Sequence, residues 1–292
     1  MSVDKLQDKI RKMKNPTLVE LSMAASELPP FLLEEEGSPA RAYGRFCREL
    51  LDGLKGIVPG IRVNFASFAL MGAEGMDALR DVLDYAKKLG YYVLLEAPQV
   101  LSHHAAAMTA QALGSADSVF YNDALLIENY AGSDVIRPFL PYVKEQGKAL
   151  FVVARTANKS APELQDLLAG SRLVHMAAAD YINRHGIETI GKRGYSQVGA
   201  LAAASNADSL KNLRARYPKL FLLLDGADYP NANAKNCSFA FDKMGYGAAA
   251  ILRLSITNAW QEAEGEPREY VKFAQAAAER MKRNLNRYVN IL

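Results

Sequence analysis

Tyr91-Tyr-Val-Leu-Leu-Glu-Ala-Pro-Gln99 is the stretch of this sequence that says most about its fold. Apolar and β-forming residues run from Tyr91 to Leu95, and polarity returns abruptly at Glu96, shortly before a proline that cannot continue a strand. A short apolar run bounded in this way is typical of a buried parallel strand. Because ligands of α/β proteins bind at the carboxyl ends of such strands, Glu96 is predicted to lie at a functional mouth or crevice.

Similar short apolar runs recur along the chain, at residues 17–22, 61–65, 118–122, 149–154, 197–201, 220–225 and 249–254. Amphipathic helical patterns separate most of them, at residues 43–55, 75–89, 102–113, 135–146 and 205–217. Eight strands that alternate with helices over about 250 residues predict a closed (β/α)8 TIM barrel. A doubly wound open sheet is the alternative, because counting strands does not show closure.

Three segments depart from minimal connections between strands. Residues 28–41 are expected to form a loop with room for a short helix, and residues 167–193 contain an apolar-periodic segment, 173–182, that predicts an extra helix. A long helix over residues 267–289 would cover the outside of the barrel. No linker-like stretch or change in composition divides the chain, so residues 1–292 are predicted to form one domain.

The composition limits which binding partners and which cellular compartment can be expected. A formal net charge of +3 over 35 basic and 32 acidic residues gives no reason to expect nucleic acid or a membrane as a partner. No apolar run approaches the ~18 residues of a membrane span, and the first residues are charged rather than signal-like. Cys47 and Cys237 are expected to be free thiols, and the protein to be cytoplasmic.

The polar residues at the predicted strand ends carry charges of both signs. Side chains alternate along a strand, and this parity predicts that the following point into the barrel mouth: Glu20, Ser22, Arg62, Asn64, Glu96, Asn122 or Asp123, Arg155, Asp225 and Arg253. Strands one and eight are neighbours in a closed barrel, as are strands two and three. We therefore predict ion pairs Glu20–Arg253 and Arg62–Glu96, with Asp225 and Arg155 nearby, in which buried charges neutralise one another.

Signals for metal or cofactor chemistry are weak. His103 and His104 are adjacent and follow a predicted helix cap at Ser102, so they cannot chelate one metal as residues four apart can. His175 and His185 have no ligand-type neighbours at metal spacing, and no glycine-rich phosphate loop or nucleophile elbow is present. We expect neither a metal nor a cofactor.

Several segments resemble the longer bacterial subfamily of orotidine 5′-phosphate decarboxylases. They are Arg155-Thr-Ala-Asn-Lys-Ser-Ala-Pro-Glu-Leu-Gln-Asp-Leu167, Gly194-Tyr-Ser-Gln-Val-Gly-Ala200, residues 208–218, Gly245-Tyr-Gly-Ala-Ala-Ala-Ile251 and Val19-Glu-Leu-Ser22. The resemblance follows nearly the whole chain in order. It implies a TIM barrel, a homodimer whose barrel mouths face the interface, and a place among the lyases of pyrimidine (UMP) biosynthesis.

The resemblance fails at the residues that carry the chemistry of that family. The family holds a lysine on strand two and an Asp-x-Lys-x-x-Asp motif after strand three, whose lysine protonates the pyrimidine. Here the strand-two position is Arg62, and the motif positions are Glu96, Pro98 and Leu101. Four more family positions have changed. The family's ribose-binding aspartate aligns with Ser22, and its phosphate-binding arginine aligns with Ile256. Its Pro-Gly-Tyr-Gly phosphate turn reads Asp225-Gly-Ala-Asp228, and its pyrimidine-binding Thr-Ser-Asn reads Thr156-Ala-Asn158.

The sequence therefore predicts a pseudoenzyme with a structural or regulatory role and no intact catalytic set, since losing one general acid alone costs ~10²–10⁴ in rate. Two alternatives stay open. One is an active orotidine 5′-phosphate decarboxylase, and the other is a repurposed barrel that binds a small carboxylate through Arg62, Glu96 and Arg253. The candidate ligand-binding residues are Ser22, Arg62, Asn64, Glu96, Asn122, Thr156, Asn158, Asp225 and Arg253.

Overall fold

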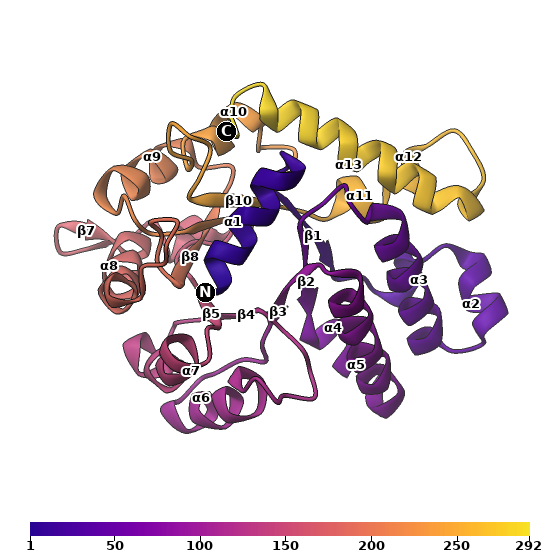
Figure 1. The fold of residues 1–292 in the computed structure, drawn as a ribbon, viewed down its shortest axis with the longest axis horizontal. Coiled ribbons are helices and arrows are strands. Elements are labelled where there is room, and N and C mark those ends of the chain that lie inside the picture. The colour runs from indigo at the N-terminus through magenta and orange to yellow at the C-terminus, as the bar shows by residue number, and fades with distance from the viewer.

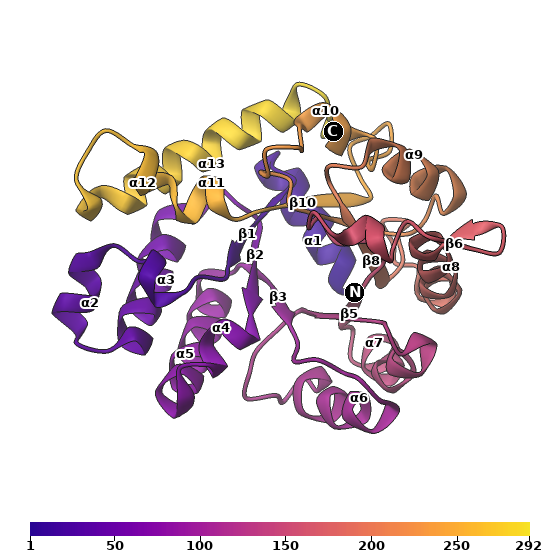
Figure 2. The same cartoon turned by 180° about the vertical axis from the view of Figure 1, so that it is seen from behind.

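Eight parallel strands close into a barrel in a computed structural model that describes residues 1–292 (Figures 1 and 2). The strands are β1 (Thr17–Leu21), β2 (Gly60–Asn64), β3 (Tyr92–Glu96), β4 (Ala124–Ile127), β5 (Ala149–Val153), β8 (Val198–Ala203), β9 (Leu222–Asp225) and β10 (Ala248–Leu252). Their order around the ring is β1-β10-β9-β8-β5-β4-β3-β2. The predicted TIM barrel is confirmed, and closure excludes the open sheet.

Helices surround the strands as an outer ring (Figure 1). They are α1 (Ser2–Met13), α2 (Pro30–Glu36), α3 (Pro39–Leu54), α4 (Phe65–Ala69), α5 (Gly72–Leu89), α6 (His103–Thr109), α7 (Leu140–Glu145), α8 (Val174–Gly186), α9 (Ala207–Arg216), α10 (Ala234–Ser238), α11 (Leu254–Thr257), α12 (Ala259–Glu262) and α13 (Tyr270–Asn286). Side-chain caps start several of them: Ser38 accepts from the backbone at α3, Ser102 at α6 and Asn206 at α9. None of these helices is long and apolar enough to cross a membrane.

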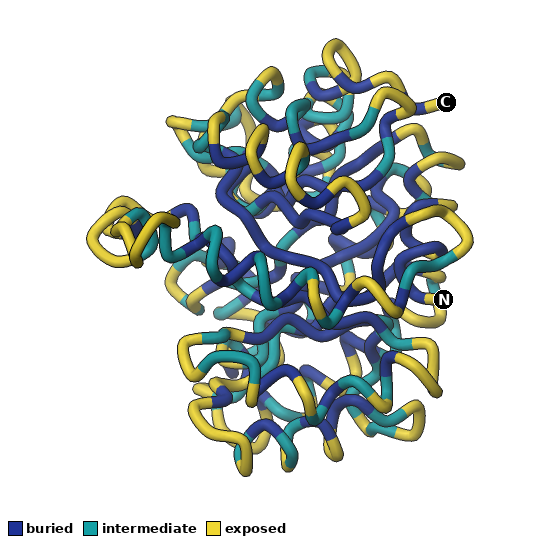
Figure 3. Tube along the Cα trace, turned by 90° about the vertical axis from the view of Figure 1, so that its left-hand side faces the viewer, coloured by how far each residue is buried: buried dark blue, intermediate teal, exposed yellow.

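The strands carry the core of the molecule. Figure 3 shows the buried parts of the chain concentrated along the strands and the inner sides of the helices. Inside the barrel, the rings of Phe151 and Phe221 meet edge to face with centroids 5.9 Å apart. Gly199 makes room for them, because a Cβ there would stand 2.6 Å from the ring of Phe151. Large side chains thus fill this part of the barrel interior.

Helix α1 lies across the amino-terminal end of the barrel (Figure 1). Ser2 Oγ hydrogen-bonds Tyr92 Oη at 2.9 Å, and the Val3 amide donates to Gln197 Oε1 at 2.8 Å. Asp4 accepts from the amides of Lys192 and Arg193 at 3.1 and 2.8 Å. Because α1 covers this end, a functional site is expected at the opposite, carboxyl end of the strands.

The prediction of the fourth strand was wrong. Residues 118–122 form no strand, and β4 begins at Ala124. Val119 is 68% exposed, whereas Phe120 and Tyr121 are partly buried and pack against the core without joining the sheet. Asn122 is buried, but its amide donates to the carbonyls of Leu113 and Phe120, ahead of the strand. Asn122 therefore lies at the amino-terminal end of the barrel, away from the predicted mouth.

The segment after β5 also differs from the prediction. The predicted extra helix is α8, which is the connecting helix between β5 and β8 itself. The true insertion is a small antiparallel hairpin of β6 (Leu168–Ala169) and β7 (Arg172–Leu173). The short helix allowed for within residues 28–41 is present as α2. The remaining predicted strands agree with the structure to within about two residues, the usual uncertainty at the ends of an element.

Candidate functional site

Arg62 lies at the centre of a charge cluster at the carboxyl end of the barrel. Its Nη2 is 2.8 Å from Glu96 Oε2, and its Nη1 is 3.0 Å from Asp225 Oδ1 and 3.3 Å from Glu20 Oε2. Glu20 is in register with Arg62 on the neighbouring strand β1, so the two side chains leave the sheet at one level. One guanidinium is thus shared by three carboxylates, and the predicted Arg62–Glu96 pair is confirmed.

Burial and charge set the protonation of this mouth cluster, which we define as Glu20, Arg62, Glu96 and Asp225. Burial raises the pKa of Glu20 above its ordinary value, against the lowering effect of Arg62, and the other two carboxylates add to the rise. For Arg62, burial alone would lower the pKa, but the three carboxylates outweigh it and raise the pKa. The guanidinium therefore stays charged, and Glu20 holds a proton more readily than an ordinary glutamate does.

The predicted Glu20–Arg253 ion pair was wrong. Arg253 Nη2 lies 3.0 Å from Glu27 Oε1, a residue in the loop after β1, and Glu20 pairs with Arg62 instead. The other oxygen of Glu27 accepts from the amide of Ala24 at 2.7 Å, which fixes the carboxylate in place. Although β1 and β10 are neighbours, the nearer loop carboxylate therefore holds Arg253.

A cleft of about 410 Å³ lies beside the mouth cluster and is lined by Ser22, Asn64 and Arg253 together with the loops after β1 and β2. Asn64 donates to Glu96 Oε2 at 3.1 Å and accepts from the amide of Ser67 at 3.1 Å. Ser67 Oγ in turn lies 3.4 Å from Ser22 Oγ. Arg253 Nε is buried and has no hydrogen-bond partner. Ser22, Asn64 and Arg253 are thus brought together as predicted.

The carboxylate of Asp228 accepts hydrogen bonds from the backbone amides that follow β10, the last barrel strand. Its Oδ2 accepts from the amides of Arg253 and Ser255 at 2.8 and 2.9 Å, and from Ser255 Oγ at 2.9 Å. In TIM barrels, the loops after strands seven and eight and a short helix nearby often bind phosphate. Here a side-chain carboxylate of the chain itself takes those donors at the start of α11.

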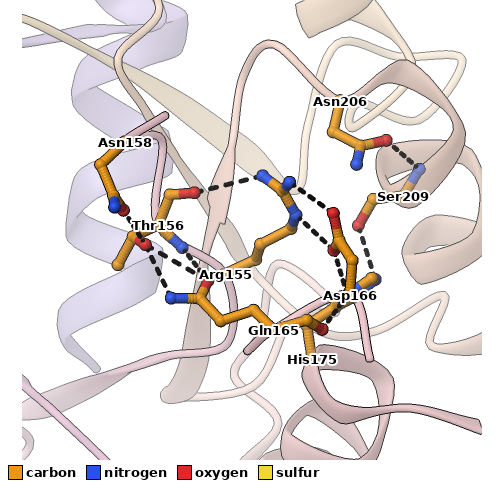
Figure 4. A network of polar contacts seen from close by, with 8 residues as sticks. All are labelled: Arg155, Thr156, Asn158, Gln165, Asp166, His175, Asn206 and Ser209. Atoms are coloured by element: carbon orange, nitrogen blue, oxygen red, sulfur yellow. Dashed lines mark hydrogen bonds and ion pairs between the residues drawn. The ribbon is translucent and has the colours of Figure 1, made fainter. Parts of the chain in front are cut away.

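Arg155, predicted to lie near these ion pairs, forms no ion pair or hydrogen bond with the mouth cluster and binds a loop carboxylate instead. Its guanidinium forms two parallel hydrogen bonds with Asp166, at 2.9 and 2.8 Å (Figure 4). His175 Nδ1 is 3.1 Å from the same carboxylate, and Ser209 Oγ is 3.2 Å from His175 Nε2. Arg155 holds the pKa of Asp166 below its ordinary value. This buried network fastens the segment after β5 to helices α8 and α9.

Thr156 and Asn158 belong to the same segment after β5. The Thr156 amide donates to Gln165 Oε1 at 2.8 Å, and Gln165 Nε2 donates to Thr156 Oγ1 at 2.8 Å. Thr156 Oγ1 also donates to Asn158 Oδ1, as Figure 4 shows. Asn158 is exposed. Both side chains are tied within their own loop, and neither forms a hydrogen bond with the mouth cluster.

The loop after β3 brings no proton donor to the cluster. Pro98 and Leu101 are exposed, and Leu101 is 65% accessible to solvent. No lysine forms an ion pair or hydrogen bond with any member of the mouth cluster. Asp225 Oδ2 accepts instead from the Ala157 amide at 3.3 Å.

Sequence reasoning missed four residues that organise this end of the barrel: Glu27, Gln165, Asp166 and His175. All four lie in loops or at the start of α8, outside the strand ends where parity applies. The sequence around His175 gives no sign of its role in this network. Asp166 lies 11 residues from Arg155 in the sequence, and only the folded course of the β5–α8 segment brings the two together.

Comparison with known proteins gives relatives over nearly the whole chain. No protein-family model matches it. The chain is 29% identical to the orotidine 5′-phosphate decarboxylase of Rhodopirellula baltica over 241 residues, which are 80% of each chain. It is 25% identical to the protein of that name from Clostridium novyi over 286 residues, which are 98% of each chain.

Solved structures agree with the fold. The OMP decarboxylase of Leishmania donovani superposes with a TM-score of 0.71 at 24% identity, covering 97% of this chain and 99% of that one. The orotidine 5′-monophosphate decarboxylase of Plasmodium berghei gives a TM-score of 0.76 at 13% identity, covering 97% and 99%. These likenesses show a shared barrel fold.

Proposed function

We propose that this chain, a homologue of the orotidine 5′-phosphate decarboxylases, does not decarboxylate orotidine 5′-monophosphate and acts as a structural or regulatory protein. The observation that carries the proposal is the mouth cluster, in which Arg62 is held by Glu20, Glu96 and Asp225. The cluster lies at the strand ends where the family resemblance puts the reacting groups. Its charges bind one another and leave no group aimed at a substrate.

Proton transfer is the first step that these residues cannot support. Arg62 cannot donate a proton near neutral pH, because the surrounding carboxylates raise its pKa further. Pro98 has no proton to give, and no lysine approaches the cluster. Glu20 can hold a proton, but its carboxyl group accepts a hydrogen bond from Arg62 at 3.3 Å, so it is engaged within the cluster rather than held toward a substrate.

Charge also opposes binding of a nucleotide. Three carboxylates and one guanidinium leave the mouth cluster with excess negative charge whenever all three acids are ionised. Asp228 adds another carboxylate, on the amides that a phosphate would use. An orotidine nucleotide carries both a carboxylate and a phosphate, so it would meet repulsion at both ends.

Isothermal titration with orotidine 5′-monophosphate and with UMP tests this proposal at the level of binding. We expect no saturable heat with either nucleotide at millimolar concentration. The Clostridium novyi relative serves as the matched control protein. Saturable binding of either nucleotide in the micromolar range would contradict the proposal and would favour an active decarboxylase.

The second candidate function is binding of a small carboxylate without a phosphate. It is favoured by one observation on Arg253, which lines the 410 Å³ cleft. The Nε of this residue is buried and has no hydrogen-bond partner. Ser22 and Asn64 line the same cleft, while Arg62 and Glu96 border it through Asn64. Titration with simple mono- and dicarboxylates, repeated on Arg253→Met, would detect this function as binding that the substitution abolishes.

We also propose a homodimer that covers the mouth face. Supporting it, segments that follow barrel strands expose large apolar side chains: Leu70 and Leu101 follow the neighbouring strands β2 and β3, and Leu254 follows β10, on the other side of β1. Apolar side chains that cluster at one face of a protein often mark an interface. A second copy seated there would also cover the mouth cluster and limit the access of water to its charges.

A further inference from the structure

A second cleft lies outside the mouth cluster, between the ends of β4 and β5 and helix α8. Its volume is about 450 Å³, within the range of small-molecule sites. Nine of its 13 lining residues are hydrophobic. The strand ends supply Val153 and Ala154, and α8 supplies Val174, Ala177 and Ala178. Small alanines on facing elements leave this space unfilled.

The part of the β5–α8 cleft wall formed by residues 164–165 is held in place by the hydrogen-bond network of Figure 4. Leu164 and Gln165 line the cleft, and Gln165 is bound to Thr156 by two hydrogen bonds of 2.8 Å. The next residue, Asp166, is held by Arg155 and His175. The cleft is therefore supported by fixed side chains rather than by a free loop.

Two tyrosines make the cleft suitable for a flat ring. Tyr181 on α8 and Tyr130 after β4 both line it, and Tyr181 Oη donates to the Asn129 carbonyl at 3.4 Å. Tyr130 is 83% exposed, so its ring is available to cover an occupant. Aromatic side chains contribute most to binding when they stack on or meet the edge of another ring.

The polar atoms of the cleft limit the charge of the occupant. Glu128 is the only carboxylate among the lining residues, and no lysine or arginine lines the cleft. An anion would therefore lose its hydration without gaining a counter-charge. Asn129 Nδ2 is buried and has no hydrogen-bond partner, and a small rotation of this amide would present a donor to an acceptor on the occupant.

We infer that the β5–α8 cleft binds an uncharged planar aromatic molecule that carries a hydrogen-bond acceptor, of which an aromatic carboxamide is the simplest example. The ring lies between Tyr130, Tyr181 and the apolar wall of α8, and its acceptor meets Asn129. This site is separate from the mouth cluster and holds whether or not the chain binds nucleotides.

Fluorine NMR with two matched probes tests the inference on the full chain. The probes are 4-fluorobenzamide, which is neutral and has a carbonyl acceptor, and 4-fluorobenzoate, which has the same ring and a negative charge. We expect saturable line broadening with the amide, and at least tenfold weaker binding of the benzoate. No saturable binding of the amide at millimolar concentration, or stronger binding of the benzoate, would overturn the inference.

Two substitutions locate the site. Ala177→Leu fills the cleft from α8 and should weaken amide binding at least tenfold, while Ala276→Leu, the same change on an exposed position of α13, should leave it unchanged. Tyr130→Ala removes an exposed wall without touching the core and should also weaken binding. Binding that survives both Ala177→Leu and Tyr130→Ala would place the probe elsewhere. A change in oligomeric mass with Ala177→Leu would identify the cleft as an interface and would also overturn the inference.

Discussion

Arg62 Nη1 lies 3.0 Å from Asp225 Oδ1, and this contact joins strands that are not neighbours. Arg62 is on β2 and Asp225 ends β9, while β1 and β10 stand between them around the ring. The guanidinium thus reaches across the barrel lumen. A side chain that crosses the lumen and binds three carboxylates links several strands of the barrel. Removing any partner should therefore lower the free energy of unfolding.

Replacing Arg62 by methionine should destabilise the protein severely. The substitution keeps the apolar stem but leaves Glu20, Glu96 and Asp225 in a mostly buried site without a counter-charge. Removing one partner of a buried ion pair costs about 3–5 kcal/mol in the free energy of unfolding. Urea denaturation at neutral pH measures this loss.

Arg80→Met is the matched control, because Arg80 pairs with Asp77 at 3.2 Å on an exposed helix surface. That change should cost less than about 1 kcal/mol. Equal effects of the two substitutions would mean that the mouth cluster is not a stabilising unit.

The pH dependence of stability should carry a contribution from Glu20 of unusual sign. Its pKa is raised in the folded protein, mainly by burial, so the folded state keeps a proton that the unfolded chain has lost. Stability therefore falls as the pH rises from the ordinary glutamate value to the raised one. Glu20→Gln removes this contribution, so the stability of the variant relative to the wild type should increase as the pH rises through that window.

Urea denaturation of both proteins between pH 4 and 8 measures the difference, and it cancels the titration of all other groups that the substitution leaves unchanged. If the wild type instead became more stable relative to Glu20→Gln with rising pH, the charge of Arg62 would outweigh burial and the pKa of Glu20 would be lowered.

Asp228 should matter for stability even though it contacts no other charged side chain. Asp228→Ala removes three hydrogen bonds to the start of α11 and leaves the amides of Arg253 and Ser255 without their acceptor. Hydrogen bonds to a charged group are worth about 1.5–3 kcal/mol net, so we expect a loss of about 2 kcal/mol. Asp117→Ala, at an exposed aspartate, should stay within about 0.5 kcal/mol. Thermal unfolding that fails to separate the two variants would reject the role of Asp228.

The barrel itself could be predicted because each buried strand leaves an apolar run that ends abruptly, as residues 91–96 do. The fourth strand was missed because Val119, Phe120 and Tyr121 have strong β propensity, yet they precede the strand in a segment that joins no sheet. The true strand, Ala124–Ile127, is only four residues long. Propensity cannot tell which of two adjacent apolar runs becomes hydrogen-bonded to β3 and β5.

Charges at the strand ends were predicted well where neighbouring strands alone decide the partner. Arg62 and Glu96 are such a case, since β2 and β3 pair with Asn64 opposite Glu96. The partners of Arg253 and Arg155 come from loops, Glu27 and Asp166, whose course the sequence pattern does not specify. Loop geometry therefore decided which predicted pairs formed.

The proposed dimer predicts a different effect for two equally exposed residues. Leu101 in the loop after β3 is 65% exposed, and Val119 in the segment before β4 is 68% exposed. Leu101→Glu should convert the dimer to monomer by placing a charge in an apolar interface, whereas Val119→Glu should not change the mass. Light scattering after size exclusion measures both. A wild-type monomer, or a dimer that survives Leu101→Glu, would contradict the proposed interface.

The most direct test of the central claim is the release of UMP from orotidine 5′-monophosphate by the purified protein, with the Clostridium novyi relative assayed in parallel. The protein should be made in a host that lacks its own decarboxylase, and product should be separated by chromatography. We predict no UMP above the rate without protein, at any protein concentration that can be reached. UMP formation that scales with protein concentration, and that Glu96→Gln abolishes, would contradict the account.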